Sequence, residues 1–271
     1  MFAMKLAARH VEKPWGRTTL PIPIDGHDGG ERVGEVWFTR GDGQPMPLLV
    51  KLLFTSERLS IQVHPDDEQA RDRGLPAGKT ECWYVTAAEP GAVLGIGTRE
   101  ALDGDRLRAL ALDGGIETMM DWKPVRPGDF FLIPAGTVHA IGAGVSLVEV
   151  QQNSDVTYRL YDYGRPRELH LDDGVAVARA EPYPDDLTLH TGDSREACRV
   201  LAQTSHFTVV KGVDAKAIMA CLGAGPVWMV PIEGEVTCGG DRAAPGACLL
   251  VEGDEPSFGP GTLVLAAGRS A

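Results

Sequence analysis

The segment from Arg58 to Asp67 constrains the fold most, because apolar and polar residues alternate along it. Alternate residues of a strand point to opposite faces, so one face is apolar. The opposite face carries three polar side chains in a row: Ser60, Gln62 and His64. A polar row on the inner face of a strand is costly to bury unless something binds it. The pattern therefore predicts a strand that lines a binding site.

A second segment, Gly128–His139, is typical of a strand, a tight Pro-Ala-Gly turn and a histidine that enters the next strand. Together with a glutamate between the two segments, this gives four residues with the types and spacing of one metal site: Gln62, His64, Glu81 and His139. Two nitrogen and two oxygen donors suit Zn²⁺ and leave room for a water or a substrate oxygen.

The composition favours many short strands joined by tight turns, because the 271 residues include 33 Gly and 19 Pro. We therefore expect a mainly β protein. The length allows one large domain or two modest ones, and we expect two β domains, residues 1–180 and 185–271. The Pro-rich stretch 181–184 is the candidate linker, and residues 98–122 are predicted to form a helical excursion within the first domain. The second domain repeats the layout of Gly128–His139 without a histidine, so we expect no metal site there.

The predicted elements follow the apolar patterning along the chain. The opening segment to about Gly30 is expected to be a structured loop, and Asp66 and Asp67 to cap a short helix that ends at Arg73. Strands of the first domain are expected at 34–39, 47–54, 80–85, 92–96, 130–133, 139–141, 146–152 and 157–163. Strands of the second are expected at 207–211, 217–221, 227–232, 247–251 and 263–265.

The net charge of −12 argues against nucleic-acid and anionic-membrane partners, because the sequence has no basic stripe. It also shows no apolar run of transmembrane length and no signal peptide, which predicts a cytoplasmic protein. The 5 cysteines lack C-x-x-C spacing and are expected to be buried, reduced thiols. An anionic small substrate remains compatible with this charge if cations cluster locally.

Several motifs then carry a family resemblance. Gly128-x₅-Pro134-x-Gly136-x₂-His139 matches the second cupin motif except that Ala143 stands where cupins usually have Asn. Within the cupins, the chain resembles the type I mannose-6-phosphate isomerases, in particular the short bacterial form. The resemblance covers roughly residues 10–170, and its other segments are Lys13-Pro-Trp-Gly16, Leu59–Asp67, Gly78–Tyr84 and Val148–Arg159.

The resemblance implies a fold of two cupin (jelly-roll) domains and one zinc ion per chain, bound by Gln62, His64, Glu81 and His139. It implies interconversion of mannose 6-phosphate and fructose 6-phosphate, with a phosphorylated hexose as the partner and a monomer or homodimer as the assembly. The family active-site positions match Trp15, Glu35, Ser60, Lys79, Glu149, Asp155 and Arg159. Ile141 replaces a frequent family Tyr, and Arg165 stands where eukaryotic relatives have Lys.

Aldose–ketose isomerisation moves a proton between C1 and C2 through an enediol, so it needs a charge-stabilising metal and a base. Glu149 is the first choice for the base, and Lys79 is expected to polarise a sugar oxygen or to carry a proton. Arg159 suits a charged oxygen or phosphate, and Arg165 is expected to complete a phosphate pocket. Asp155 is expected to orient Arg159 or to open the sugar ring.

Other interpretations stay open at this point. Trp15 and Glu35 also fit a purely structural role, and Glu149 fits a structural partner of Arg159. At the level of function, the alternatives are an isomerase of another phosphorylated aldose, a non-catalytic sugar-binding cupin, and an Fe(II) cupin dioxygenase. Gln62 disfavours the dioxygenase, because it would fill a position that oxygen chemistry leaves open.

Overall fold

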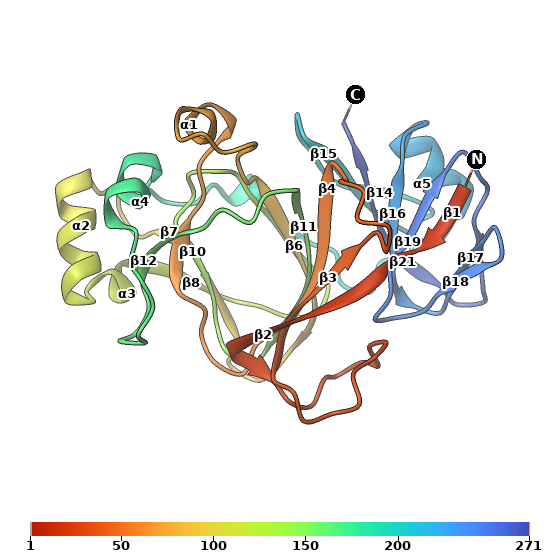
Figure 1. Cartoon of the computed structure of the whole chain (residues 1–271), viewed down its shortest axis with the longest axis horizontal. Helices are drawn as coiled ribbons and strands as arrows, with labels where there is room; N and C mark the ends of the chain where they lie inside the picture. The colour runs from red at the N-terminus through yellow and green to blue at the C-terminus, as the bar shows by residue number, and fades with distance from the viewer. Residues whose placement is uncertain (1, 271) are drawn as a thin grey trace.

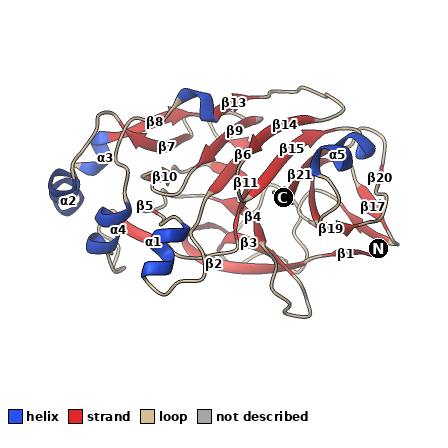
Figure 2. Cartoon of the chain, turned by 90° about the horizontal axis from the view of Figure 1, so that it is seen from above, coloured by secondary structure: helices blue, strands red, loops and turns tan. Residues whose placement is uncertain are grey.

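The computed structural model describes residues 2–270 and is built mainly from antiparallel strands. Figure 1 shows a central β unit, a second β unit beside it, and helices at the opposite end. The view from above in Figure 2 shows the same lengthwise arrangement, with both chain ends in the second unit.

A seven-stranded sheet forms one wall of the first unit, in the order β13-β9-β6-β11-β4-β3-β2. Its strands are β2 (Ala7–Arg17), β3 (Val33–Thr39), β4 (Leu48–Phe54), β6 (Glu81–Ala88), β9 (Asp129–Ile133), β11 (Val145–Gln152) and β13 (Thr188–His190). A five-stranded sheet forms the other wall, in the order β12-β5-β10-β7-β8. Its strands are β5 (Ile61–Val63), β7 (Val93–Thr98), β8 (Met120–Pro124), β10 (His139–Ile141) and β12 (Tyr158–Tyr161).

The two sheets pack face to face, as in a jelly roll. One buried cluster joins Leu53 and Trp83 of the larger sheet to Leu94 and Ile141 of the smaller one. Alternate residues of each strand point into this space, so both walls contribute side chains to the interior of the unit.

The second unit contains a six-stranded sheet in the order β1-β19-β16-β21-β15-β14 and a small sheet in the order β18-β17-β20. The six strands are β1 (Phe2–Lys5), β14 (Arg199–Gln203), β15 (Phe207–Gly212), β16 (Val227–Glu233), β19 (Leu249–Glu252) and β21 (Leu263–Arg269). The small sheet consists of β17 (Val236–Cys238), β18 (Asp241–Ala243) and β20 (Ser257–Phe258).

The helices are short and lie outside the sheets. They are α1 (Asp67–Asp72), α2 (Gly104–Asp113), α3 (Ile116–Met119), α4 (Leu171–Val177), α5 (Ala215–Leu222) and the 3₁₀ turn η1 (Asp185–Leu187). Among the described residues, no helix has the length and apolar character needed to cross a membrane.

Most predicted strands are confirmed to within a few residues, and the predicted helix after Asp66 is confirmed as α1. Asp66 is the N-cap and forms a capping box with Gln69. The helical excursion at 98–122 is confirmed in part, because α2 and α3 lie there but β8 already begins at Met120. The strand at 58–67 is shorter than expected, since only Ile61–Val63 pairs as a strand.

Two predictions of secondary structure were wrong. The opening segment is not a loop, because β1 and β2 occupy most of its first 17 residues. The strand was not predicted because the segment contains proline, and the pairing of β2 with β3 is indeed interrupted between Glu12 and Arg17. Residues 217–221 are not a strand but part of α5, whose Asp214 N-cap accepts a hydrogen bond from the Ala217 N–H. Alanine, methionine and leucine favour the helix there.

The two β units share apolar packing. One buried cluster includes Phe38 and Val50 of the first unit and Phe207 and Trp228 of the second. In addition, β1 pairs with β19, so the chain starts in the second unit before it enters the first. The division into domains 1–180 and 185–271 stays a prediction, and the structure adds this strand crossing to it.

Candidate active site

The two sheets bring the predicted donor residues into one place. β10 pairs with β5 so that His139 lies directly opposite Gln62. The turn before β10 also contacts the other histidine segment, because the Gly136 N–H donates to the His64 carbonyl at 2.8 Å. Gly136 has a φ of +88°, a left-handed conformation that glycine adopts without steric cost.

The side chains of His64, Glu81 and His139 converge, and their donor atoms lie within 4.8 Å of one another. Nε2 of His64 is 3.6 Å from one Glu81 carboxylate oxygen, and Nε2 of His139 is 3.5 Å from the other. All three side chains are 1% exposed, so water contributes almost nothing to their solvation.

The imidazole of His139 is oriented by the backbone. Its Nδ1 donates to the Thr137 carbonyl at 2.9 Å, which leaves the Nε2 lone pair free to face Glu81. The Gln62 amide lies beside it, with the nearer amide atom 3.3 Å from Nε2. Ser60 Oγ lies 3.1 Å from the other amide atom. Because the oxygen and nitrogen of an amide exchange by a flip, Gln62 can present its oxygen to a cation at this point.

The electrostatics of the three groups fit a cation. Burial lowers the pKa of His139 to about 4 and the pKa of His64 well below its ordinary value, so both rings are neutral at pH 7, the form that can bind a metal. Burial, together with the Glu149 carboxylate, raises the pKa of Glu81. Its Oε1 has no hydrogen-bond partner among the described residues. A buried carboxylate with one oxygen free of hydrogen bonds, beside two neutral imidazoles, is a donor set suited to a divalent metal such as Zn²⁺.

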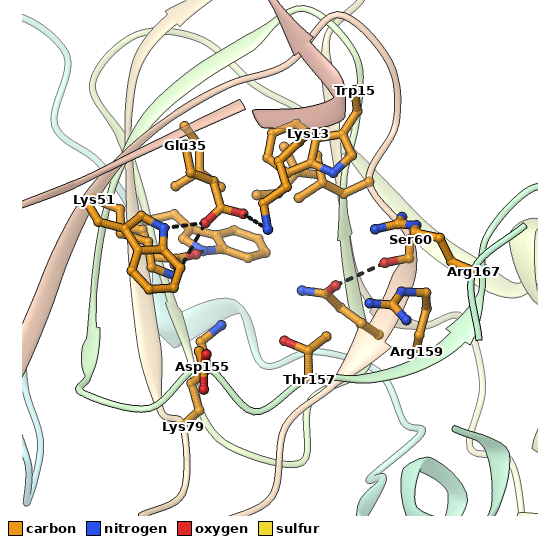
Figure 3. A pocket seen from close by; sticks show the side chains of 17 residues that line it. Lys13, Trp15, Glu35, Lys51, Ser60, Lys79, Asp155, Thr157, Arg159 and Arg167 are labelled. Carbon is orange, nitrogen blue, oxygen red and sulfur yellow. Dashed lines mark hydrogen bonds and ion pairs between the residues drawn. The ribbon is translucent and has the colours of Figure 1, made fainter. Parts of the chain in front are cut away.

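Lys79 connects this cluster to a cavity of about 240 Å³. Its ammonium is 2.6 Å from Glu81 and donates to Nε2 of His64 at 3.0 Å. Burial acts to lower the pKa of Lys79, but Glu81 and Glu149 outweigh it and raise the pKa, so the group is charged. The cavity, shown in Figure 3, is lined mainly by polar residues from both sheets, among them Lys13, Trp15, Glu35, Lys51, Ser60, Gln62, Lys79, Trp83, Glu149, Asp155, Thr157, Arg159 and Arg167.

Glu149 lies on the inner face of the seven-stranded sheet between Lys51 and Trp83, its partners in register on the neighbouring strands. One carboxylate oxygen accepts a hydrogen bond from the Lys51 ammonium at 3.0 Å, and the other accepts one from Trp83 Nε1 at 3.0 Å. Burial acts to raise the pKa of Glu149, but Lys51 and Lys79 outweigh it and lower the pKa. The structural partner of Glu149 is therefore Lys51, not Arg159.

Glu35 belongs to the same charged row. Its carboxylate lies 3.0 Å from the Lys13 ammonium and 3.9 Å from that of Lys51, and it accepts a hydrogen bond from Trp37 Nε1 at 2.6 Å. Burial opposes ionisation of Glu35, but Lys51 and Lys13 together lower its pKa. Lys51 therefore lies between the carboxylates of Glu35 and Glu149.

Arg159 and Arg167 lie together on the other side of the cavity in Figure 3, next to Ser60. Burial, with the positive charge of Arg167, lowers the pKa of Arg159. Nε of Arg159 is buried and has no hydrogen-bond partner among the described residues. Arg167 forms a two-pronged pair with Asp162, at 2.6 and 2.7 Å. The two guanidinium groups carry two positive charges, and the Asp162 carboxylate compensates for only one of them, so an anion can bind beside them.

Of the predicted site residues, only Arg165 lies outside both the cavity lining and the cluster. Its guanidinium instead contacts the Arg58 carbonyl at 2.6 Å and Asp162 at 3.1 Å. Arg167, two residues later in the loop between β12 and α4, lines the cavity.

Sequence reasoning missed Lys51, Arg167 and Lys13. Lys51 could have been predicted from the sequence, because it is the single charged residue inside the apolar run Leu48–Phe54. A lysine in the middle of a fully buried strand needs a carboxylate partner. The sequence does not indicate that Arg167 reaches the cavity, because its position depends on the path of a loop.

Comparisons with known proteins agree with this arrangement. Residues 29–92 match the family model described as phosphomannose isomerase type I, catalytic domain. The chain is 38% identical over 196 residues to mannose-6-phosphate isomerase ManA of Bacillus subtilis (strain 168), covering 67% of this chain but 62% of ManA. It is 36% identical over 223 residues to YvyI of the same organism, covering 76% of this chain and 69% of YvyI.

The whole architecture is also similar to a solved structure. The crystal structure of the mannose 6-phosphate isomerase from Bacillus subtilis superposes with a TM-score of 0.78 at 26% identity, covering 98% of this chain and 99% of that one. The similarity thus includes both β units. The chain belongs to the type I phosphomannose isomerase family.

Proposed function

We propose that the protein is a zinc-dependent isomerase that interconverts mannose 6-phosphate and fructose 6-phosphate. The observation that carries the proposal is the convergence of His64, Glu81 and His139 beside a cavity with cationic side chains at its walls. Family membership supports the same activity. Because the match spans 62% of ManA, the activity of that relative is a proposal for this chain.

Gln62, His64, Glu81 and His139 would hold one zinc ion per chain. Bound there, the metal supplies a Lewis acid that stabilises negative charge on the sugar oxygens near C1 and C2. The chemistry needs no redox change, which favours zinc over iron. The same amide, Gln62, disfavours an oxygen-activating site because it occupies a fourth position.

Lys79 and Glu149 are the proposed proton-transfer groups. Lys79 is charged and lies at the boundary between the cluster and the cavity, so it can donate a proton to a sugar oxygen. Glu149 stays the proposed base and lines the same cavity. Its low pKa makes it a weak base in this state, and its bond to Lys51 would have to loosen for proton transfer.

The phosphate group is proposed to bind Arg159 and Arg167. Arg159 offers an unpartnered Nε, and the repulsion between the two guanidinium groups is relieved by a dianion. This replaces the predicted role of Arg165, which contacts Arg58 and Asp162 outside the cavity. Trp15, Glu35, Ser60 and Asp155 line the remaining wall and are proposed to contact the sugar.

The test is a coupled assay that follows fructose 6-phosphate formed from mannose 6-phosphate by the purified protein. Turnover that depends on the phosphate, with free mannose far slower, is the expected result. Faster turnover of another phosphorylated aldose would reassign the substrate. Binding of the sugar phosphates without turnover of any would identify a sugar-binding cupin instead.

A further inference from the structure

Two cysteines of the second β unit meet from different elements. Cys198 immediately precedes the edge strand β14, and Cys221 lies in the last turn of α5. Their sulfur atoms are 2.9 Å apart. Cys221 is exposed and Cys198 is half-buried, which corrects the expectation that all the cysteines are buried. Cys82, Cys238 and Cys248 are buried and separate from this pair.

Backbone hydrogen bonds hold the two cysteine-bearing segments together. The N–H groups of Val213 and Asp214 donate to the carbonyls of Glu196 and Ala197, each at 3.1 Å. The segment before Cys198 is therefore tied to the start of α5. The helix is anchored in turn, because Ile218 is fully buried in the apolar core of the second unit.

The side chains support the same geometry. Cys198, Met219 and Leu222 all pack against that apolar core as partly buried residues. Both cysteines thus belong to elements held by hydrogen bonds and by packing. A disulfide bond is about 2.05 Å long, so the sulfurs need to approach by only about 0.9 Å.

We propose that Cys198 and Cys221 form a reversible intrachain disulfide by exchange with a low-molecular-weight disulfide such as oxidised glutathione. The thiolate of the exposed Cys221 attacks one glutathione sulfur, and one glutathione thiolate leaves. The Cys198 thiol then gives up its proton and attacks the Cys221 sulfur, releasing the second glutathione. Two protein thiols are oxidised, and one glutathione disulfide is reduced to two thiols.

The order of attack follows from exposure and charge. Burial and the adjacent Cys221 raise the pKa of Cys198 to about 12, so Cys198 is the poorer first nucleophile. Once Cys221 carries glutathione, its sulfur lies beside Cys198, and proximity drives the second step.

The disulfide would restrain the edge strand β14. β14 is the last strand of the six-stranded sheet, and an unpaired edge is a site of local opening and of aggregation. A bridge from the start of β14 to α5 restrains that edge in the folded protein. In the unfolded chain it closes the loop between the two cysteines and so lowers the conformational entropy of the unfolded state. The bridge involves none of the residues that line the active-site cavity, so it should leave turnover unchanged.

The test exposes the reduced full-length protein to oxidised glutathione and measures intact mass, with Cys198→Ser and Cys221→Ser as matched variants. We expect the unaltered protein to lose two hydrogens and to retain no glutathione. Cys198→Ser should instead keep one glutathione, because the second thiol is missing, and Cys221→Ser should react much more slowly.

Melting provides a second readout. The oxidised protein should melt about 5–10 °C higher than the reduced protein, and dithiothreitol should reverse the shift. A stable glutathione adduct on the unaltered protein, or no reaction with either it or Cys198→Ser, would overturn the proposal. This outcome is independent of isomerase activity.

Discussion

At the scale of single residues, the site consists of charges that are stable only as a set. Lys51, Glu149, Lys79 and Glu81 are each at most 4% exposed, and each lies beside a group of opposite charge. Removing one member of such a buried set leaves another uncompensated, which is far more damaging than losing a surface ion pair. Changes at these residues therefore test chemistry and stability together.

The first prediction concerns the proposed base. Glu149→Gln should retain zinc and lose at least about 100-fold in kcat, because a positioned proton acceptor is removed. Metal analysis and steady-state kinetics provide the two readouts. Near-normal turnover in Glu149→Gln would show that another group takes the proton.

The pH dependence of stability tests the same residue. Because the folded state lowers the pKa of Glu149, its ionised form contributes stability above the ordinary carboxyl value of 4.5. That contribution is lost as the pH falls below 4.5 toward the lowered pKa. The difference in unfolding free energy between the unaltered protein and Glu149→Gln should therefore be largest near neutral pH and shrink in acid. A difference that grows in acid would contradict the pairing with Lys51.

Arg167 and Arg165 form a matched pair for the phosphate proposal. Both bond to Asp162, but only Arg167 lines the cavity. Arg167→Met should raise KM for mannose 6-phosphate at least about tenfold, the loss of one charge-assisted contact. Arg165→Met should change KM much less. Equal effects of the two substitutions would refute the assignment.

At the scale of elements, the sequence pattern was most informative where one face of a strand was buried. The alternation from Leu59 to His64 identified the polar face that supplies Gln62, and the Pro-Ala-Gly turn identified the entry of His139. Residues 217–221 were misread because a short apolar run suits a strand or a buried helix equally. The charged row across β3, β4 and β11 depends on the strand register, which local sequence does not determine.

The turn that positions the two histidines gives an element-scale prediction. Gly136→Ala places a side chain at φ +88° and against the Arg179 guanidinium, so it should lower stability by about 1–2 kcal/mol and weaken zinc binding. Gly91→Ala is the control, because Gly91 also has a left-handed φ, +82°, but has open space around it. It should lose stability without losing zinc affinity. Equal zinc affinity in the two variants would show that the turn at Gly136 does not contribute to zinc binding.

At the scale of the whole molecule, the two β units are joined by a common core and by β1. Residues 185–271 alone would lack β1 and would expose Phe207 and Trp228, which are buried against the first unit. We therefore expect this fragment to show no cooperative thermal transition and to aggregate, because a large apolar face is uncovered. A sharp, reversible transition of the isolated fragment would show that the second unit folds independently. The Pro-rich stretch 181–184 and the repeated layout of Gly128–His139 predicted two β domains. They held no information on this strand crossing, which depends on pairing between residues about 250 positions apart.

The central claim is that one metal ion, held by Gln62, His64, Glu81 and His139, is required for the reaction at this cavity. The most direct measurement is isomerase activity on mannose 6-phosphate after complete removal of metal by a chelator, followed by titration with zinc. We predict that activity falls to background, returns in proportion to zinc and saturates at one ion per chain, whereas His139→Ala binds no zinc and is not restored. Full activity of the metal-free protein with all four residues intact would contradict the account.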